Sequence, residues 1–150
     1  MEQQQKLDPE NSMGRLMGQV GKAMAKSINE RFKSRGIPIN LDQWIVLLHL
    51  WQEDGQNQAQ LGEEAGHNKT TVTRAIDSLE KRNLVLRITD KQDRRNKLIY
   101  LTNQGKNMQD QLIPIALDIH QQAVQGISDT DLETCKNVLR KMYQNLKVDI

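Results

Sequence analysis

The chain has 150 residues, of which 37% are hydrophobic and 27% charged, which fits one compact domain or one domain with an appended interface. It holds no run of about 18 apolar residues and no basic-then-apolar leader, so we expect neither a membrane span nor secretion. The overall net charge of +2 indicates no class of partner, and the single Cys135 excludes an internal disulfide and favours a cytoplasmic location.

The first half of the chain predicts two amphipathic helices. Over residues 7–35, apolar side chains recur every four residues from Leu16 to Phe32, which is typical of one long helix. Gly36 ends it. Asn40 then caps a second helix, with a Gln in capping-box position. Its predicted buried face consists of Leu41, Trp44, Ile45, Leu48 and Trp51.

A short helix, a polar helix and a hairpin follow. The helices are predicted over residues 58–65 and 69–82, with Asn68 as the cap of the second. Residues 84–89 and 97–101 are predicted as two strands around a charged tip. In the first strand, three aliphatic residues alternate with two others: Leu84, Leu86 and Ile88 against Val85 and Arg87.

Two more helices complete the chain. Thr102 caps the fifth, and Pro114 is expected to kink or break it. Ser128 starts the last, whose apolar stripe includes Cys135, a thiol that we expect to be buried and inert. One small core cannot bury this stripe together with that of residues 7–35.

Basic residues concentrate in the middle of the chain. Residues 66–106 contain ten Lys or Arg against four Asp or Glu, a local balance of +6, whereas the remainder carries −4. A solvated surface is the ordinary explanation of such a stretch. Its coincidence with a helix, turn, polar helix and hairpin favours a nucleic-acid-binding face.

The polar helix has the residue types that a major-groove recognition helix needs. One face is apolar, and small hydroxyls and cations near the N-terminus reach bases and phosphates without steric clash. The helix dipole adds attraction for phosphate. The candidates here are Asn68, Lys69, Thr70, Thr71, Thr73 and Arg74. A surface helix in which the threonines serve as caps is the alternative.

The hairpin tip carries a second candidate contact. An arginine on a protruding hairpin can enter the narrow minor groove, and a neighbouring carboxylate can orient its guanidinium. Asp93 is placed to do this for Arg95. A charge-balanced solvated turn is the alternative. Phosphate contacts are assigned to Lys69, Arg87, Arg94 and Lys97.

These segments, taken together, resemble the MarR family of bacterial transcriptional regulators. Residues 41–47, 68–74 and 79–85 match in order, and then comes the family's most specific signature, Asp-x-Arg followed by Leu-Thr-x-x-Gly, here Asp93-Arg94-Arg95 and Leu101-Thr102-Asn103-Gln104-Gly105. The likeness extends over residues 7–148. Asn83 replaces the usual glycine at a helix C-terminus, where Asn tolerates a left-handed conformation.

The resemblance implies a mainly α-helical winged helix-turn-helix protein with six helices and a β-hairpin wing, acting as a homodimer. Residues 1–36 and 102–150 are then the dimerisation helices, and residues 37–101 the DNA-binding domain. It also implies a pseudo-palindromic double-stranded operator. Arg95 matches the family's minor-groove residue, and Thr70, Thr71, Thr73 and Arg74 match the major-groove helix. Family habit favours a repressor; a transcriptional activator is the alternative.

Many family members release DNA when a small phenolic or amphipathic molecule binds between the dimer and DNA-binding regions. The candidates to line such a cleft are Met13, Met17, Trp44 and His49, since methionine surfaces adapt to varied ligands. Plain core packing is the alternative for each residue.

Other functions find less support. The glycines are scattered and Cys135 has no recognisable base partner, so we expect no enzyme and no cofactor. No metal site is expected, because His49, His67 and His120 are isolated from one another. A winged helix that only docks proteins is also disfavoured, since such domains often lose the basic helix and wing that this chain keeps.

Overall fold

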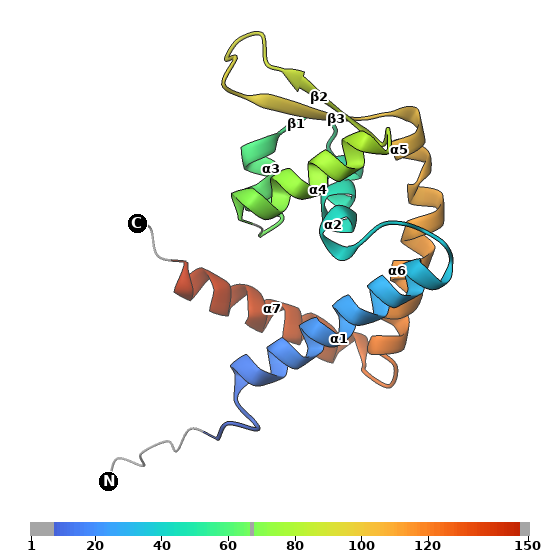
Figure 1. The fold of residues 1–150 in the computed structure, drawn as a ribbon. Helices are drawn as coiled ribbons and strands as arrows, with labels where there is room; N and C mark the ends of the chain where they lie inside the picture. The colour runs from blue at the N-terminus through green and yellow to red at the C-terminus, as the bar shows by residue number, and fades with distance from the viewer. Residues whose placement is uncertain (1–7, 67, 148–150) are drawn as a thin grey trace.

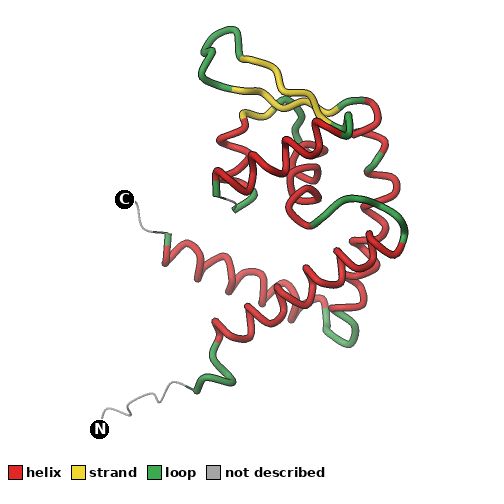
Figure 2. Tube along the Cα trace, in the orientation of Figure 1, coloured by secondary structure: helices red, strands yellow, loops and turns green. Residues whose placement is uncertain are grey.

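A computed structural model describes residues 8–66 and 68–147, and over these residues the chain forms seven helical segments and one three-stranded antiparallel sheet (Figures 1 and 2). The elements are α1 (Met13–Ser34), α2 (Leu41–Gln52), β1 (Gln56–Asn57), α3 (Gln58–Glu64), α4 (Lys69–Lys81), β2 (Val85–Thr89), β3 (Lys97–Leu101), α5 (Asn103–Asn107), α6 (Gln109–Ala123) and α7 (Asp129–Leu146). The mainly helical, winged helix-turn-helix fold is thereby confirmed.

Side-chain caps determine where the helices begin. The predicted capping box at α2 is present, because Asn40 and Gln43 each accept a hydrogen bond from the other's backbone N–H. Helix α1 begins at Met13 rather than near Leu7, since the Ser12 hydroxyl accepts from the backbone N–H of Arg15. Leu7 itself lies outside the described residues.

The hairpin is the wing expected from the sequence, and it gains a third strand. Strand β3 lies in the centre of the sheet, between β2 and the two-residue β1. Two residues are too few for a periodic pattern, so β1 was not predicted. The alternation in β2 places Val85 and Arg87 toward the helices, whereas Leu86 and Ile88 are 48% and 46% exposed on the outer face.

The structure shows no break of the helix at Pro114. Helix α6 continues through this residue, and the predicted fifth helix divides instead at Met108, between α5 and α6. An interior proline removes one N–H donor and crowds the carbonyl four residues before it, yet α6 continues through Pro114, its sixth residue, which lies on the exposed side of the helix. The chain therefore turns at Met108, while α6 runs from the wing end of the molecule toward α1 (Figure 1).

The hydrophobic core lies among α2, α3, α4 and the sheet. Helices α1 and α6 each pack one of their sides against it. Helix α1 adds Ile28 and Phe32, and α6 adds Leu112, Ile115 and Ile119. Among the described helices, none combines the length and apolarity that crossing a bilayer requires.

Helices α1 and α7 leave most of their apolar side chains exposed within one chain. No residue of α7 is buried, and the expectation that Cys135 is buried is wrong for the single chain, where this thiol is exposed. We define the exposed apolar face by its large side chains, which are Met13, Leu16, Met17, Val20, Leu117, Ile127, Val138, Leu139, Tyr143 and Leu146. A surface of this kind is typical of a protein–protein interface.

Candidate nucleic-acid interface

Helix α4 buries one side and presents the other to solvent. Val72, Ala75, Ile76 and Leu79 form its buried side. Its N-terminus is capped by Asn68, whose side-chain oxygen accepts from the backbone N–H of Thr71 at 2.8 Å, and no acidic residue lies in its first turn. The helix dipole is therefore uncompensated at the end where anions bind.

The predicted contact residues of α4 differ in accessibility. Lys69, Thr70 and Arg74 are exposed, whereas Thr71 and Thr73 are half-buried. The Thr73 hydroxyl donates to the Lys69 carbonyl at 2.8 Å and accepts from Gln58 Nε2 at 3.3 Å. The side chain of Thr73 is thus held by the protein itself, which a sequence pattern does not reveal.

The wing tip has the geometry that the sequence predicts. Asp93 Oδ1 accepts from Arg95 Nε at 3.2 Å and from its backbone N–H at 3.1 Å, and Oδ2 accepts from Nη2 at 3.4 Å. Hydrogen bonding from the Arg95 side chain, and then from its backbone, lowers the pKa of Asp93 below its ordinary 3.8. The carboxylate is therefore ionised at neutral pH, and it orients a guanidinium whose side chain is 91% exposed.

One hollow joins α3, the start of α4 and the wing tip. Its volume is about 450 Å³, and it is lined by Asn57, Gln58, Ala59, Gly62, Glu63, Lys69, Val72, Arg95, Asn96 and Lys97. The structure thus brings Lys69, Arg95 and Lys97 together although they are far apart in sequence. This is a concave basic surface of the kind that accommodates a phosphate backbone.

Arg87 has three partners within the protein. Its guanidinium contacts Asp77 at 2.8 Å and Glu80 at 3.2 Å, and its Nε donates to Gln58 Oε1 at 3.0 Å. This arrangement favours a role other than the predicted phosphate contact. The sequence contained a signal, because Asp77 and Glu80 are two acids three residues apart on a helix that is otherwise basic.

The four predicted ligand-lining residues do not meet within one chain. Trp44 is buried in the core, edge-to-face with Phe32 and Trp51 at ring distances of 5.9 and 5.8 Å. Met13 and Met17 are exposed at the other end of α1, and Met17 lies about 22 Å along the helix from Phe32. His49 is half-buried, with its Nδ1 2.8 Å from the Ile45 carbonyl.

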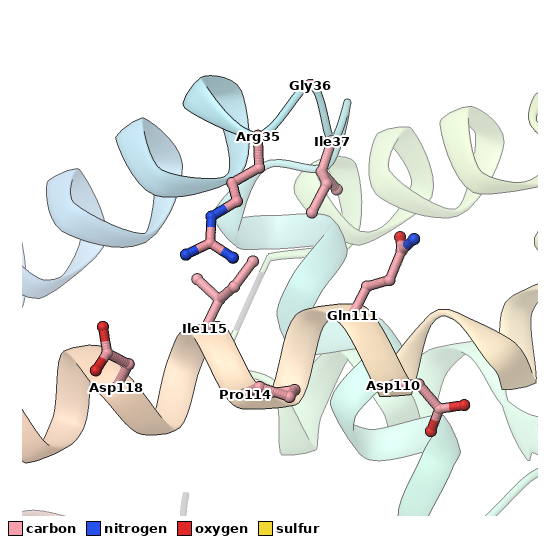
Figure 3. Close-up of a pocket in the computed structure, with 8 residues that line it drawn as sticks. All are labelled: Arg35, Gly36, Ile37, Asp110, Gln111, Pro114, Ile115 and Asp118. Atoms are coloured by element: carbon pink, nitrogen blue, oxygen red, sulfur yellow. The ribbon is translucent and has the colours of Figure 1, made fainter.

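A separate cavity of about 700 Å³ lies between the end of α1 and α6 (Figure 3). Its lining is mixed in charge, and the Arg35 guanidinium extends from the α1 end toward Ile115. The lining residues are Arg35, Gly36, Ile37, Asp110, Gln111, Pro114, Ile115 and Asp118. Beside it, Arg31 contacts Asp118 at 2.7 Å, so an ion pair joins α1 to α6.

No group of three or more His, Cys, Asp or Glu side chains is placed to hold a metal ion within residues 8–66 and 68–147. His67, one of the histidines considered in the sequence, lies outside the described residues.

Comparison with known proteins connects this surface to a family. Residues 39–97 match the model of the MarR family. An uncharacterized HTH-type transcriptional regulator of Bacillus subtilis, YybA, is 24% identical over 139 residues, which are 93% of this chain and 91% of the relative.

Two solved structures share the fold. A putative MarR family regulator from Listeria monocytogenes, complexed with 26mer DNA, has a TM-score of 0.82 and 24% identity, over 90% of this chain and 89% of that one. CouR from Rhodococcus jostii, bound to p-coumaroyl-CoA, has a TM-score of 0.80 and 24% identity, over 93% and 97%. Residues 39–97 are thus similar to the MarR family, and the chain as a whole shares the winged helix-turn-helix fold of these solved structures.

Proposed function

We propose that this protein is a homodimeric transcriptional repressor that binds a pseudo-palindromic double-stranded DNA operator. The observation that carries the proposal is the hollow shared by the N-terminus of α4 and the wing tip, which places Lys69, Arg95 and Lys97 on one concave surface. The DNA-bound regulator of the same fold supports it.

In the proposed complex, α4 enters the major groove and the wing lies over the adjacent minor groove. Thr70, Thr71 and Arg74 face base edges, with Thr73 positioned by Gln58. Arg95, oriented by Asp93, enters the minor groove, where the potential is most negative. Lys69, Arg94 and Lys97 contact phosphates. Asn68 caps the N-terminus of α4, which faces the DNA backbone.

The proposed dimer uses the exposed apolar face of α1, α6 and α7. Residues 1–36 and 102–150 supply the dimerisation helices, and residues 37–101 the DNA-binding domain. Pairing two chains sets the two α4 helices about 34 Å apart, one turn of B-DNA. A protein with this role acts in the cytoplasm, at the bacterial nucleoid.

Release from DNA by a small amphipathic ligand is the regulatory part of the proposal. A regulator of the same fold is bound to p-coumaroyl-CoA, and the cavity between α1 and α6 is lined by the proposed dimerisation helices and by Ile37, where the proposed DNA-binding domain begins. Conformations of the dimer that differ in the distance between the two α4 helices fit the operator differently. A ligand that binds one of these conformations more tightly shifts the equilibrium toward it by the difference in affinity.

Selection of duplex DNA by the purified protein at about 150 mM salt tests the function. We expect an enriched palindrome with half-sites about ten base pairs apart, and a drop in affinity when p-coumaroyl-CoA, used as the probe, is added. A pool without any motif contradicts sequence-specific regulation. Undiminished binding across aromatic acids and their thioesters contradicts only the ligand-release part.

Arg95→Ala is expected to weaken operator binding about tenfold while leaving the dimer intact, because it removes a minor-groove contact on an exposed tip.

Arg74→Ala is expected to reduce the free energy of operator binding by about 1–3 kcal/mol through loss of a base contact. Fluorescence anisotropy with the selected operator measures both. Arg140→Ala, an exposed arginine on α7, is the control that retains full binding. Wild-type affinity in the R95A dimer contradicts the role of the wing.

A further inference from the structure

The wing is anchored to the helices by one arginine with three separate partners. Arg87 extends from β2, and its guanidinium contacts Asp77 and Glu80 on α4 and Gln58 on α3. The Arg87 side chain is only 18% exposed, although it lies on a short strand near the surface. Charge-assisted hydrogen bonds to a planar fork fix direction as well as distance.

The same network reaches the DNA-facing side of α4. Gln58 accepts from Arg87 through Oε1 and donates through Nε2 to the Thr73 hydroxyl, which in turn donates to the Lys69 carbonyl. A continuous chain of hydrogen bonds therefore links the wing to the first turn of α4. Further along β2, the next residue of the inward face, Thr89, is exposed, and its hydroxyl accepts across the hairpin from Lys97 Nζ at 2.8 Å.

We propose that Arg87 is a positioning residue that fixes the wing relative to α4, and thereby sets where Arg95 meets the minor groove. The inference rests on the proposed DNA-binding function and deepens it. Two grooves must be engaged at once, so a small rotation of the wing misplaces its tip even when every contact residue is present. Arg87 thus acts through Arg95 and does not itself touch DNA.

The conservative variant Arg87→Lys separates positioning from a direct phosphate contact. Lysine keeps the positive charge but cannot reach three partners with a planar fork. For a positioning residue, R87K and R87Q both weaken operator binding about tenfold, within the range of coupling in such networks. If Arg87 contacts phosphate, R87K retains most of the binding, and that result overturns the inference.

Removal of the Asp77 carboxylate changes operator affinity in opposite directions, depending on whether Arg87 positions the wing or contacts a phosphate. Asp77→Asn removes a negative charge from a DNA-binding helix, so it strengthens binding if Arg87 is thereby released to a phosphate. If Arg87 positions the wing, D77N weakens binding about threefold, and in the R87Q background it has no further effect. Stronger binding by D77N, or full additivity, overturns the inference. Lys81→Gln removes an exposed cation of α4 outside the Arg87 network, and it is the control for a change of charge on this helix.

Hydrogen exchange of the DNA-free protein makes the test independent of DNA binding. We expect the backbone amides of β2 and β3 to exchange faster in R87K and D77N than in wild type, while the amides of α2 keep their protection. Unchanged exchange in the hairpin contradicts the anchoring role. If the wild-type protein selects no operator but these amides respond, the proposed function fails and the anchoring role of Arg87 stands.

Discussion

Leu139→Glu on α7 is expected to convert the proposed dimer to monomers and to weaken operator binding by about 100-fold or more. The reason is that two linked half-site contacts gain an avidity of about 10²–10⁴ over a single contact. Leu139 lies on the exposed apolar face, beside Tyr143 and Leu146, which are 68% and 76% exposed in the single chain. A carboxylate buried at that interface without a partner opposes association.

Sedimentation velocity measures the oligomeric state, and anisotropy measures operator affinity at the same protein concentration. The matched control is Gln144→Glu, which introduces the same charge on the opposite side of α7 and is expected to leave both unchanged. A dimer that persists in L139E, or a monomer that binds the operator with wild-type affinity, contradicts the proposed assembly.

Gly105→Ala is expected to destabilise the fold by about 3 kcal/mol or more, because a Cβ at this position overlaps the carbonyl oxygen of Leu84. That oxygen cannot move away easily, since it accepts from the Thr102 N–H at 3.0 Å. The Gly105 backbone is held on both sides: its N–H donates to the Thr102 hydroxyl, and its carbonyl accepts from Trp51 Nε1, each at 3.0 Å.

Urea unfolding followed by circular dichroism gives the free energy of unfolding of this variant. Gln104→Ala, one residue away and exposed in the same short helix, controls for loss of a side chain from α5 and is expected to change stability by less than about 0.5 kcal/mol. Equal stability of G105A and wild type means that the junction between the wing and α5 can relax, contrary to the expectation from its packing.

The helices and the wing were predictable because their signals are local. The caps at Asn40, Asn68, Thr102 and Ser128 lie where the sequence places them, and Asn83 adopts the expected left-handed φ of 65°. Pairing of Asp93 with Arg95 was also predictable, since the two residues are only two positions apart.

Features that depend on distant segments were not predictable in the same way. The partners of Arg87 come from α3 and α4, and the alternation in β2 does not say which set of side chains faces inward. Cys135 lies on an apolar stripe, and a stripe predicts burial without saying against which chain. The four proposed ligand-lining residues share two helices, but Trp44 packs into the core, far from Met13 and Met17.

The surroundings of Gly105 bear on what the family signature detects. In this structure the Leu-Thr-x-x-Gly half of the signature consists of a buried leucine, a capping threonine and a glycine without room for a Cβ, so its constraints are those of a joint between sheet and helix. In the Asp-x-Arg half, both arginines are exposed and have no such packing requirement, and Asp93 is half-buried. A relative could therefore lose its wing arginine, and with it the proposed minor-groove contact, and still keep the joint. A match to the Leu-Thr-x-x-Gly half therefore identifies the architecture of a sequence. Whether that sequence keeps the proposed DNA contact of the wing must be judged from the residues at the wing tip.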